Sequence, residues 1–249
     1  MRSQEAGVVS EMPSSRISAK VWAWVRIASA VVLCVAVFRQ GAASAIGVAE
    51  DGGSVVGYGF NFVSYFTNES NLAAVVMLVM GGVALLRGRD LPVWFGTFRV
   101  VVVTCMATTG IVYNALLRGD GTPNPDSIWW ANEVLHVVGP VLVVLDGVFG
   151  PGVRRVSFRV LWWVAGFPVV WAIYTMLRAP IAAEPTTGEQ PWYPYPFLDP
   201  AADGVLSVVL HIVAIAGVIV GVGAVVVWGM RLRVGSNDAN SARATVRHR

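Results

Sequence analysis

The chain contains few charged residues. Asp, Glu, Lys and Arg make up 13% of its 249 residues, whereas an ordinary soluble domain carries about 25%. Hydrophobic residues make up 55%, and the mean hydropathy is +0.63. This composition excludes a typical soluble globular domain and predicts an integral membrane protein.

Acidic residues are fewer than basic ones, 15 against 18, so the net charge is +3. This excess does not indicate a nucleic-acid partner, because the basic residues cluster beside apolar runs. Lys20 is the only lysine, and together with abundant Ala, Val and Gly this points to a GC-rich bacterial genome.

The chain has only two cysteines, Cys34 and Cys105, and both lie inside apolar runs. Two such residues exclude a disulfide framework and are expected to pack as small hydrophobes. The sequence also lacks the internal repeat that marks many transporters.

Six apolar runs are long enough to cross a bilayer, which takes about 20 residues. They predict an all-α polytopic fold with spans at roughly 21–41, 64–86, 97–118, 131–149, 159–179 and 204–229. The chain then divides into an N-terminal tail (1–20), a six-helix domain (21–230) and a basic C-terminal tail (231–249). The polar stretches 1–15 and 235–249 are expected to be disordered.

The basic residues predict the orientation of these spans. Fifteen of the 18 fall on the side of the two termini, and only Arg39, Arg118 and Arg178 lie at the opposite ends of the spans. The positive-inside rule therefore places both termini in the cytoplasm. An alternative is a signal peptide, because Ala43-Ser44-Ala45 follows a basic start and an apolar core.

The fifth connection, residues 180–203, is long and rich in proline and aromatic residues, with the string Pro191-Trp192-Tyr193-Pro194-Tyr195-Pro196-Phe197-Leu198-Asp199. Prolines favour an extended backbone, and aromatic rings suit the membrane interface. The composition predicts a lid or rim over the outer face, formed by Tyr195, Pro196, Phe197 and Asp199.

Polar residues gather near the predicted outer ends of five spans, whereas the inner halves read as almost entirely Val, Leu, Ala and Gly. Such residues are costly in lipid and often mark a site. The helical spacing puts several on shared faces. The candidates are Thr67, Ser70, Asn71, Asn114, Asn132, His136 and His211.

These residue types are consistent with nucleophilic catalysis. A threonine hydroxyl such as that of Thr67 needs a base to accept its proton, and neutral His136 can supply one. Asn132, one turn before His136, is a candidate to orient the imidazole. Asn71 or Asn114 is a candidate to stabilise an oxyanion, with Ser70 and His211 in support.

Three short motifs resemble the androgen-induced family of multi-pass membrane threonine hydrolases and its bacterial six-helix relatives. They are Phe66-Thr67, Asn132-x-x-x-His136 followed by Pro140, and Tyr195-Pro196-Phe197-Leu198-Asp199. The resemblance implies hydrolysis of fatty acid esters of hydroxy fatty acids, with Thr67 as nucleophile and His136 as its partner. Two departures from the family pattern are the polar Asn68-Glu69-Ser70-Asn71 and a histidine-to-proline spacing that is one residue shorter.

The leading hypothesis is a bacterial plasma-membrane hydrolase that cleaves a lipid-like ester and needs no cofactor or metal. Its partners are membrane lipids and that substrate, which can enter between the helices, and nucleic acid is not expected. The oligomeric state stays open.

Three other hypotheses stay open. The same polar residues can bind or transport a small amphipathic solute, although a transporter needs polar groups in the cytoplasmic half too. A metal-dependent hydrolase would use His136, His211 and a carboxylate such as Asp203 or Glu133. The fourth reading is a structural membrane protein without chemistry.

Overall fold

The protein is a bundle of α-helices in a computed structural model. The backbone is described for residues 13–118 and 127–247, and the side chains for residues 18–118 and 127–235. Six helical segments are long and apolar enough to cross a membrane, which confirms the predicted number of spans: Ser18–Glu50, Phe66–Arg87, Trp94–Leu117, Trp129–Phe149, Phe158–Ile181 and Pro200–Gly235.

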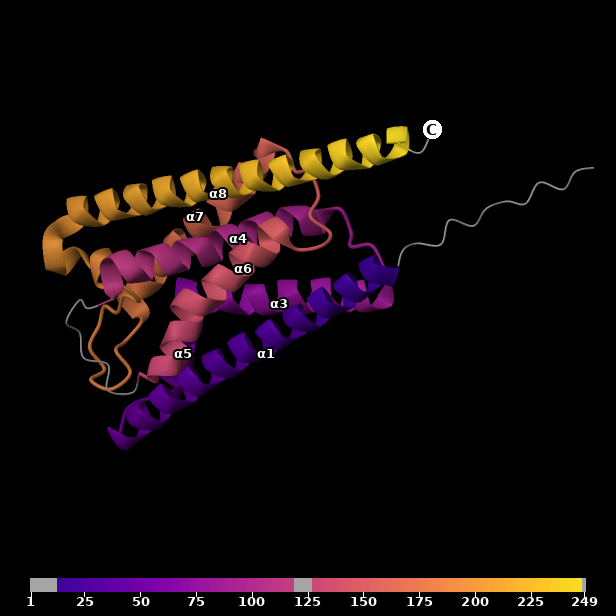
Figure 1. The fold of residues 1–249 in the computed structure, drawn as a ribbon. Coiled ribbons are helices and arrows are strands. Elements are labelled where there is room, and N and C mark those ends of the chain that lie inside the picture. The colour runs from indigo at the N-terminus through magenta and orange to yellow at the C-terminus, as the bar shows by residue number, and fades with distance from the viewer. Residues whose placement is uncertain (1–12, 119–126, 248–249) are drawn as a thin grey trace, which may run out of the picture.

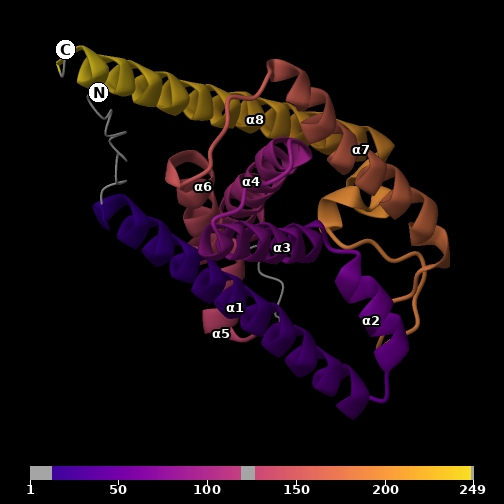
Figure 2. The same ribbon diagram turned by 90° about the vertical axis from the view of Figure 1, so that its right-hand side faces the viewer.

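The helices follow one another as an up-and-down bundle (Figures 1 and 2). Their bounds are α1 (Pro13–Glu50), α2 (Val55–Val63), α3 (Phe66–Arg87), α4 (Trp94–Val112), α5 (Trp129–Glu133), α6 (Gly139–Phe149), α7 (Leu161–Arg178) and α8 (Pro200–Arg247). The short helix α2 lies between the first two spans and was not expected from the sequence. Both views place α1 and α8 on opposite sides, with α3, α4 and α6 between them.

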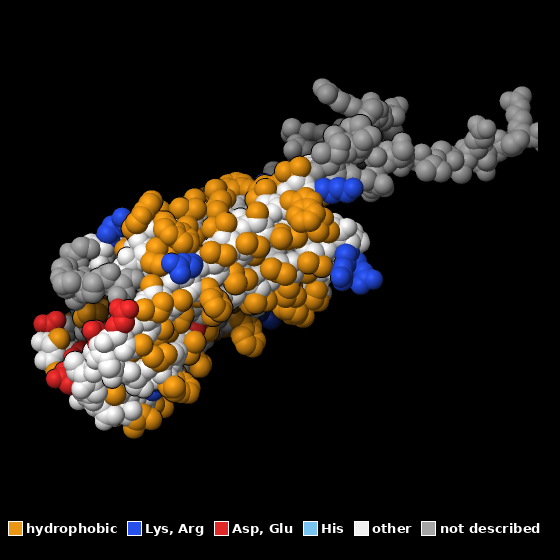
Figure 3. Space-filling view, turned by 90° about the horizontal axis from the view of Figure 1, so that it is seen from below, with side chains coloured by type: hydrophobic (Ala, Val, Ile, Leu, Met, Phe, Trp, Pro, Cys, Tyr) orange, Lys and Arg blue, Asp and Glu red, His pale blue; other side chains and the backbone are white. Residues whose placement is uncertain are grey.

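Two ends of the bundle can be distinguished. We call the end where α1 begins and α8 finishes the terminal end, and the opposite end, with α2 and residues 182–199, the loop end (Figure 1). Acidic side chains gather at the loop end, and hydrophobic side chains cover the surface between the ends (Figure 3).

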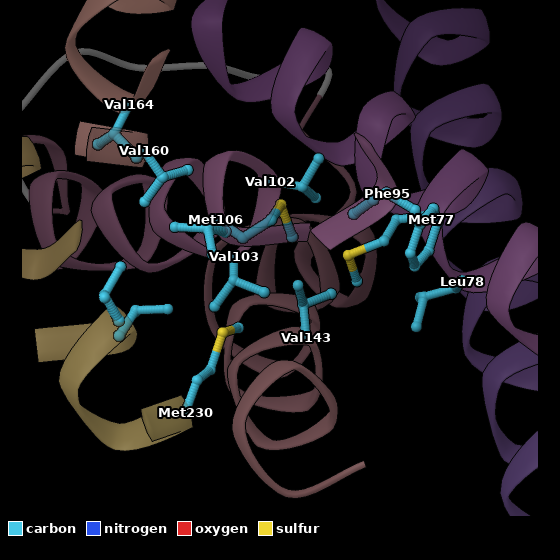
Figure 4. Close-up of a cluster of buried hydrophobic side chains, with 14 of the residues drawn as sticks. Met77, Leu78, Phe95, Val102, Val103, Met106, Val143, Val160, Val164 and Met230 are labelled. Carbon is cyan, nitrogen blue, oxygen red and sulfur yellow. The ribbon is translucent and has the colours of Figure 1, made fainter. Parts of the chain in front are cut away.

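Helix α4 forms the centre of the packing. Its Phe95, Val102, Val103 and Met106 meet side chains from α3, α6, α7 and α8 in the largest buried apolar cluster (Figure 4). The contact with α6 depends on Gly147, because a Cβ at that position would lie 2.3 Å from a methyl carbon of Val103. Small residues of this kind let membrane helices approach closely.

One prediction about helix ends is wrong. Residues 235–249 were expected to be disordered, but α8 continues to Arg247. Of the segment 1–15, residues 1–12 lie outside the described residues, and α1 begins at Pro13. Helix α8 also bends sharply near its start, at Gly204, whose φ of 82° favours glycine.

Candidate functional site

A cavity lies between α3, α4, α7 and α8, beneath residues 195–198 of the loop end. Its volume is about 110 Å³, within a hollow of about 820 Å³ that includes space open to the surroundings. The cavity is therefore smaller than a usual small-molecule site, roughly 300–1,000 Å³. None of the described residues that line it is charged. The lining side chains with a polar atom are Thr67, Thr108, Thr109, Tyr113, Tyr195 and Trp171, whose indole nitrogen donates to the Ser64 carbonyl.

Thr67 lies on the wall of this cavity, in the first turn of α3. The first amides of a helix have no partner within the helix, and that of Thr67 donates to the Tyr195 phenol oxygen over 3.4 Å. Tyr195 is held by the rings of Tyr65, Trp171 and Phe197, at centroid separations of 5.7, 5.9 and 5.2 Å. The loop segment is therefore fixed directly over the predicted nucleophile.

The four residues of the predicted lid occupy different positions. Tyr195 and Phe197 line the cavity together with Leu198. Pro196 is exposed and is not among the residues that line the cavity. A carboxylate oxygen of Asp199 accepts a hydrogen bond from the Ala201 amide over 2.8 Å. Asp199 therefore caps the start of α8 instead of covering the cavity.

Tyr195 is protonated at all ordinary pH values, because burial raises its pKa to about 12 and hydrogen bonds from Thr67 offset only part of this effect. The folded chain thus keeps a proton that an unfolded chain loses above pH 10.0. This contribution to stability is intact below that pH and is lost as the pH rises toward 12. We expect Tyr195→Phe to flatten the alkaline fall of the thermal unfolding midpoint, and equal slopes in both proteins would contradict this.

His136 lies in a second group of polar residues and does not line the cavity. Its Nδ1 lies 3.0 Å from the Asn132 carbonyl oxygen. A carbonyl only accepts, so Nδ1 carries the proton and Nε2 has a free lone pair. The Tyr113 ring, which does line the cavity, stacks on the imidazole at 4.0 Å between centroids. Within the described ranges, no hydrogen bond joins Thr67 to His136.

The helix around His136 is locally widened. Residues Val134–Val138 form a π-helical segment just before Pro140. A proline lacks an amide hydrogen and crowds the carbonyl four residues earlier, which here belongs to His136. The Asn114 side-chain amide donates to that carbonyl over 3.3 Å. The Asn114 side chain therefore donates a hydrogen bond to a backbone carbonyl, whereas the sequence had suggested that it binds an oxyanion.

The other predicted supporting residues mostly satisfy nearby backbone groups. The Ser70 hydroxyl donates to the Phe66 carbonyl over 2.7 Å. The Asn71 amide nitrogen donates to the carbonyls of Thr67 and Leu135 over 2.8 and 3.2 Å, which ties α3 to the His136 segment. The side-chain amide of Asn132 donates a hydrogen bond to the Tyr113 hydroxyl. The imidazole is therefore oriented by the backbone carbonyl of Asn132 and not by its side chain.

His211 belongs to α8 and faces the loop segment. Its Nδ1 lies 2.9 Å from the Ser207 carbonyl oxygen, and its ring stacks on Phe197 at 5.6 Å. Among the described residues, no hydrogen bond or ring contact joins His211 to His136. The described part of the chain also holds no group of three or more His, Cys, Asp and Glu residues that could hold a metal ion. These positions favour a role for His211 in supporting the lid.

Sequence reasoning missed several cavity residues. Thr108 and Thr109 are buried in the middle of α4, and neither hydroxyl has a hydrogen-bond partner among the described residues. A Thr-Thr pair in the middle of a span was the available signal, since uncompensated polar groups are costly there. Both residues line the cavity, but their hydroxyl oxygens are themselves buried.

A buried ionic group at the terminal end was also missed. Arg26, Arg99 and Asp146 are only 1%, 3% and 5% exposed. The Nε atom of Arg26 donates to an Asp146 carboxylate oxygen over 2.7 Å. The halves of the spans next to the termini therefore hold buried charged side chains, although they were expected to be almost entirely apolar, and the argument against transport that rested on this expectation no longer holds.

Three comparisons with known proteins found no match to the chain. It matches no family model, no curated protein and no solved structure. The fold and the side-chain geometry therefore carry the functional argument. On that basis the chain is a six-helix, multi-pass membrane protein with an apolar cavity and a threonine on the cavity wall.

Proposed function

We propose that the protein binds the apolar chain of a lipid-like ester in this cavity and cleaves the ester at Thr67. The observation that carries the proposal is the position of Thr67, a hydroxyl held under Tyr195 on the wall of an otherwise apolar cavity. The resemblance of three motifs to membrane threonine hydrolases supports the same chemistry.

The cavity suits a substrate that arrives from lipid. Val169 of α7 lines the cavity and is 50% exposed, so the cavity reaches the side of the bundle at that point. An apolar chain can enter there without crossing water, and burial of each methylene contributes about 0.8 kcal/mol. The ester group would then lie near Thr67 and the Tyr195 phenol.

In the proposed reaction the Thr67 oxygen attacks the ester carbonyl carbon and its proton passes to a base. The alcohol leaves with a proton, and water then hydrolyses the acyl-threonine to release the acid and restore Thr67. Tyr195 keeps its proton, so its phenol is a donor for the carbonyl oxygen as negative charge develops there.

His136 is the proposed base, through the free lone pair of Nε2. Tyr113 stacks on the imidazole and itself lines the cavity, so His136 reaches the Thr67 proton only after this ring moves aside or through a bridging water. Catalytic contacts of this kind commonly tighten only when substrate is bound.

A cavity-filling substitution tests the substrate site. Ala216 of α8 lines the cavity, whereas Ala214 is exposed and is not among its lining residues. We expect Ala216→Phe to lower turnover of long-chain esters about tenfold or more because the larger ring takes the space of several methylenes. Short-chain esters should be hydrolysed as by the wild type.

The control for this experiment is Ala214→Phe on the same helix, and the readout is the ratio of long-chain to short-chain hydrolysis in proteoliposomes. An unchanged ratio in a well-folded Ala216→Phe protein would show that the acyl chain does not use the cavity.

A second candidate function is binding or transport of an amphipathic solute without chemistry. It is favoured by the position of His136 outside the lining of the cavity and by the hydroxyls of Thr108 and Thr109, which have no hydrogen-bond partner among the described residues. Solute flux in proteoliposomes that persists in Thr67→Ala protein would support it. Ester turnover that depends on Thr67 would exclude it as the sole activity.

A further inference from the structure

The ionic group at the terminal end carries an excess of positive charge. Arg26 and Arg99 bring two guanidinium groups, and Asp146 supplies one carboxylate, of which one oxygen accepts from Arg26 and the other has no hydrogen-bond partner among the described residues. Both guanidinium groups also donate to the Pro151 carbonyl, Arg26 over 2.8 Å and Arg99 over 3.5 Å. One carboxylate cannot neutralise two buried cations.

Arg99 is the cation whose charge is less fully compensated, because no carboxylate oxygen forms an ion pair with it among the described residues and it shares the field of Asp146 with Arg26. It is 3% exposed, and its Nε atom has no hydrogen-bond partner among the described residues. The Phe95 ring lies 5.5 Å from its guanidinium carbon, which compensates only part of the lost hydration. Because an uncompensated buried charge costs several kcal/mol, a bound anion beside Arg99 would stabilise the fold.

A hollow next to Arg99 offers a place for such an anion. It is lined by Arg99, by Arg154 and by Phe95 and Gly96 from the first turn of α4. The amides of Phe95 and Gly96 already donate to the carbonyls of Pro92 and Val93 over 3.0 and 3.2 Å, so the start of α4 attracts negative charge through its dipole alone. Arg154 is partly exposed, and its contact with Asp90 is long, at 3.5 Å. Two cations and a helix start therefore converge on one space.

The shape of the hollow favours a headgroup over a fully enclosed ion. Its empty space of about 280 Å³ includes open surroundings, and its own volume is only about 10 Å³, room for one water molecule at most. Beside it, Val93 and Trp94 are 85% and 55% exposed. Exposed apolar and Trp side chains at a helix end suit the membrane interface, where lipid phosphates lie.

The geometry points to a binding site for the phosphate of an anionic phospholipid, held by Arg99 and Arg154 at the start of α4, with the acyl chains against the surface around Val93 and Trp94. Guanidinium groups bind phosphate through charge-assisted hydrogen bonds. The bound lipid would supply the negative charge that Arg99 lacks, and it would stabilise the terminal end of the bundle. This inference does not depend on the proposed hydrolysis.

The test measures the thermal unfolding midpoint of the full-length protein in neutral detergent. Phosphatidylglycerol, phosphatidylcholine with the same acyl chains, or inorganic phosphate is added, and native mass spectrometry counts bound lipids. Phosphatidylglycerol should raise the wild-type midpoint more than phosphatidylcholine does. Inorganic phosphate alone should have little effect, because it lacks the acyl chains.

Three variants locate the site. Arg99→Met should lower the affinity for phosphatidylglycerol about ten- to a hundredfold, as expected for loss of hydrogen bonds to a charged group. Arg99→Lys, which keeps the charge but not the planar fork, should show an intermediate loss. Arg89→Gln removes an exposed charge from the same end of the bundle and should bind like the wild type.

The stability of Arg99→Met without lipid is a further readout. Without lipid, Arg99→Met should be at least as stable as the wild type, because it removes an incompletely compensated buried charge. The inference is overturned if phosphatidylglycerol and phosphatidylcholine act alike on the wild type, or if Arg99→Lys and Arg99→Met keep the full response. A full response to inorganic phosphate would identify a free-anion site and overturn the assignment to lipid.

Discussion

Replacing Thr67 with alanine should lower ester turnover by about a thousandfold or more, because the variant has no oxygen with which to form the acyl intermediate. The variant should still fold, since the backbone amide of Thr67 keeps its contact with Tyr195 when the hydroxyl is removed. Hydrolysis by purified protein in proteoliposomes measures the effect, and the thermal unfolding midpoint checks that the fold is retained.

Two substitutions on the same helix serve as controls for Thr67→Ala. Thr67→Ser keeps a hydroxyl and should retain measurable turnover. Ser70→Ala removes a hydroxyl that donates to the Phe66 carbonyl and is 1% exposed, so turnover should change little. If Thr67→Ala hydrolyses the ester at the wild-type rate, the nucleophile is another group or the chain is a binding protein.

Replacing Asp146 with alanine should have the largest effect on stability, about 3–5 kcal/mol of unfolding free energy, because it breaks a buried ion pair. The carboxylate is 5% exposed and accepts from Arg26 at 2.7 Å. Its loss leaves two buried guanidinium groups, those of Arg26 and Arg99, without any acidic partner among the described side chains. Denaturant unfolding in a fixed detergent measures the change.

The Asp90→Ala variant is the matched control for Asp146, since Asp90 contacts Arg154 at 3.5 Å on the surface of the same end. Exposed pairs contribute little, so this substitution should leave the unfolding midpoint unchanged. Combining Asp146→Leu with Arg26→Met should recover much of the lost stability, because an apolar replacement of a buried ion pair is often neutral. Equal effects of Asp90→Ala and Asp146→Ala would contradict this assignment.

The sequence predicted the six spans well because hydropathy and length are enough to define a membrane helix. Their ends were harder to predict. The polar C-terminal stretch reads as a disordered tail, yet α8 passes through it to Arg247. The short helix α2 was also missed, since its nine residues are too few for a span.

The candidate site was predicted in part. Thr67 and the loop residue Tyr195 do come together, although they are far apart in the sequence. The pairing of Thr67 with His136 depends on how each helix is rotated, which periodicity alone does not fix. Pro140 widens the turn that carries His136, and Tyr113 covers the imidazole. A proline four residues after the histidine was the available signal for this local change.

The ionic group at the terminal end was missed for a different reason. Arg26 and Arg99 were counted as flanking charges that set the orientation of the chain. Their burial depends on tertiary packing around Asp146, an acidic residue inside the fourth span. An intramembrane carboxylate is costly without a partner, so Asp146 alone predicts a nearby arginine.

The central claim is tested most directly by reaction of the wild type, Thr67→Ala, Thr67→Ser and His136→Ala with a fluorophosphonate probe, followed by mapping of the modified residue by mass spectrometry. The account predicts a label on Thr67 that long-chain esters compete away, that serine retains, and that the two alanine variants lose. A folded wild type that is not labelled, or is labelled at a residue outside the cavity, would contradict it.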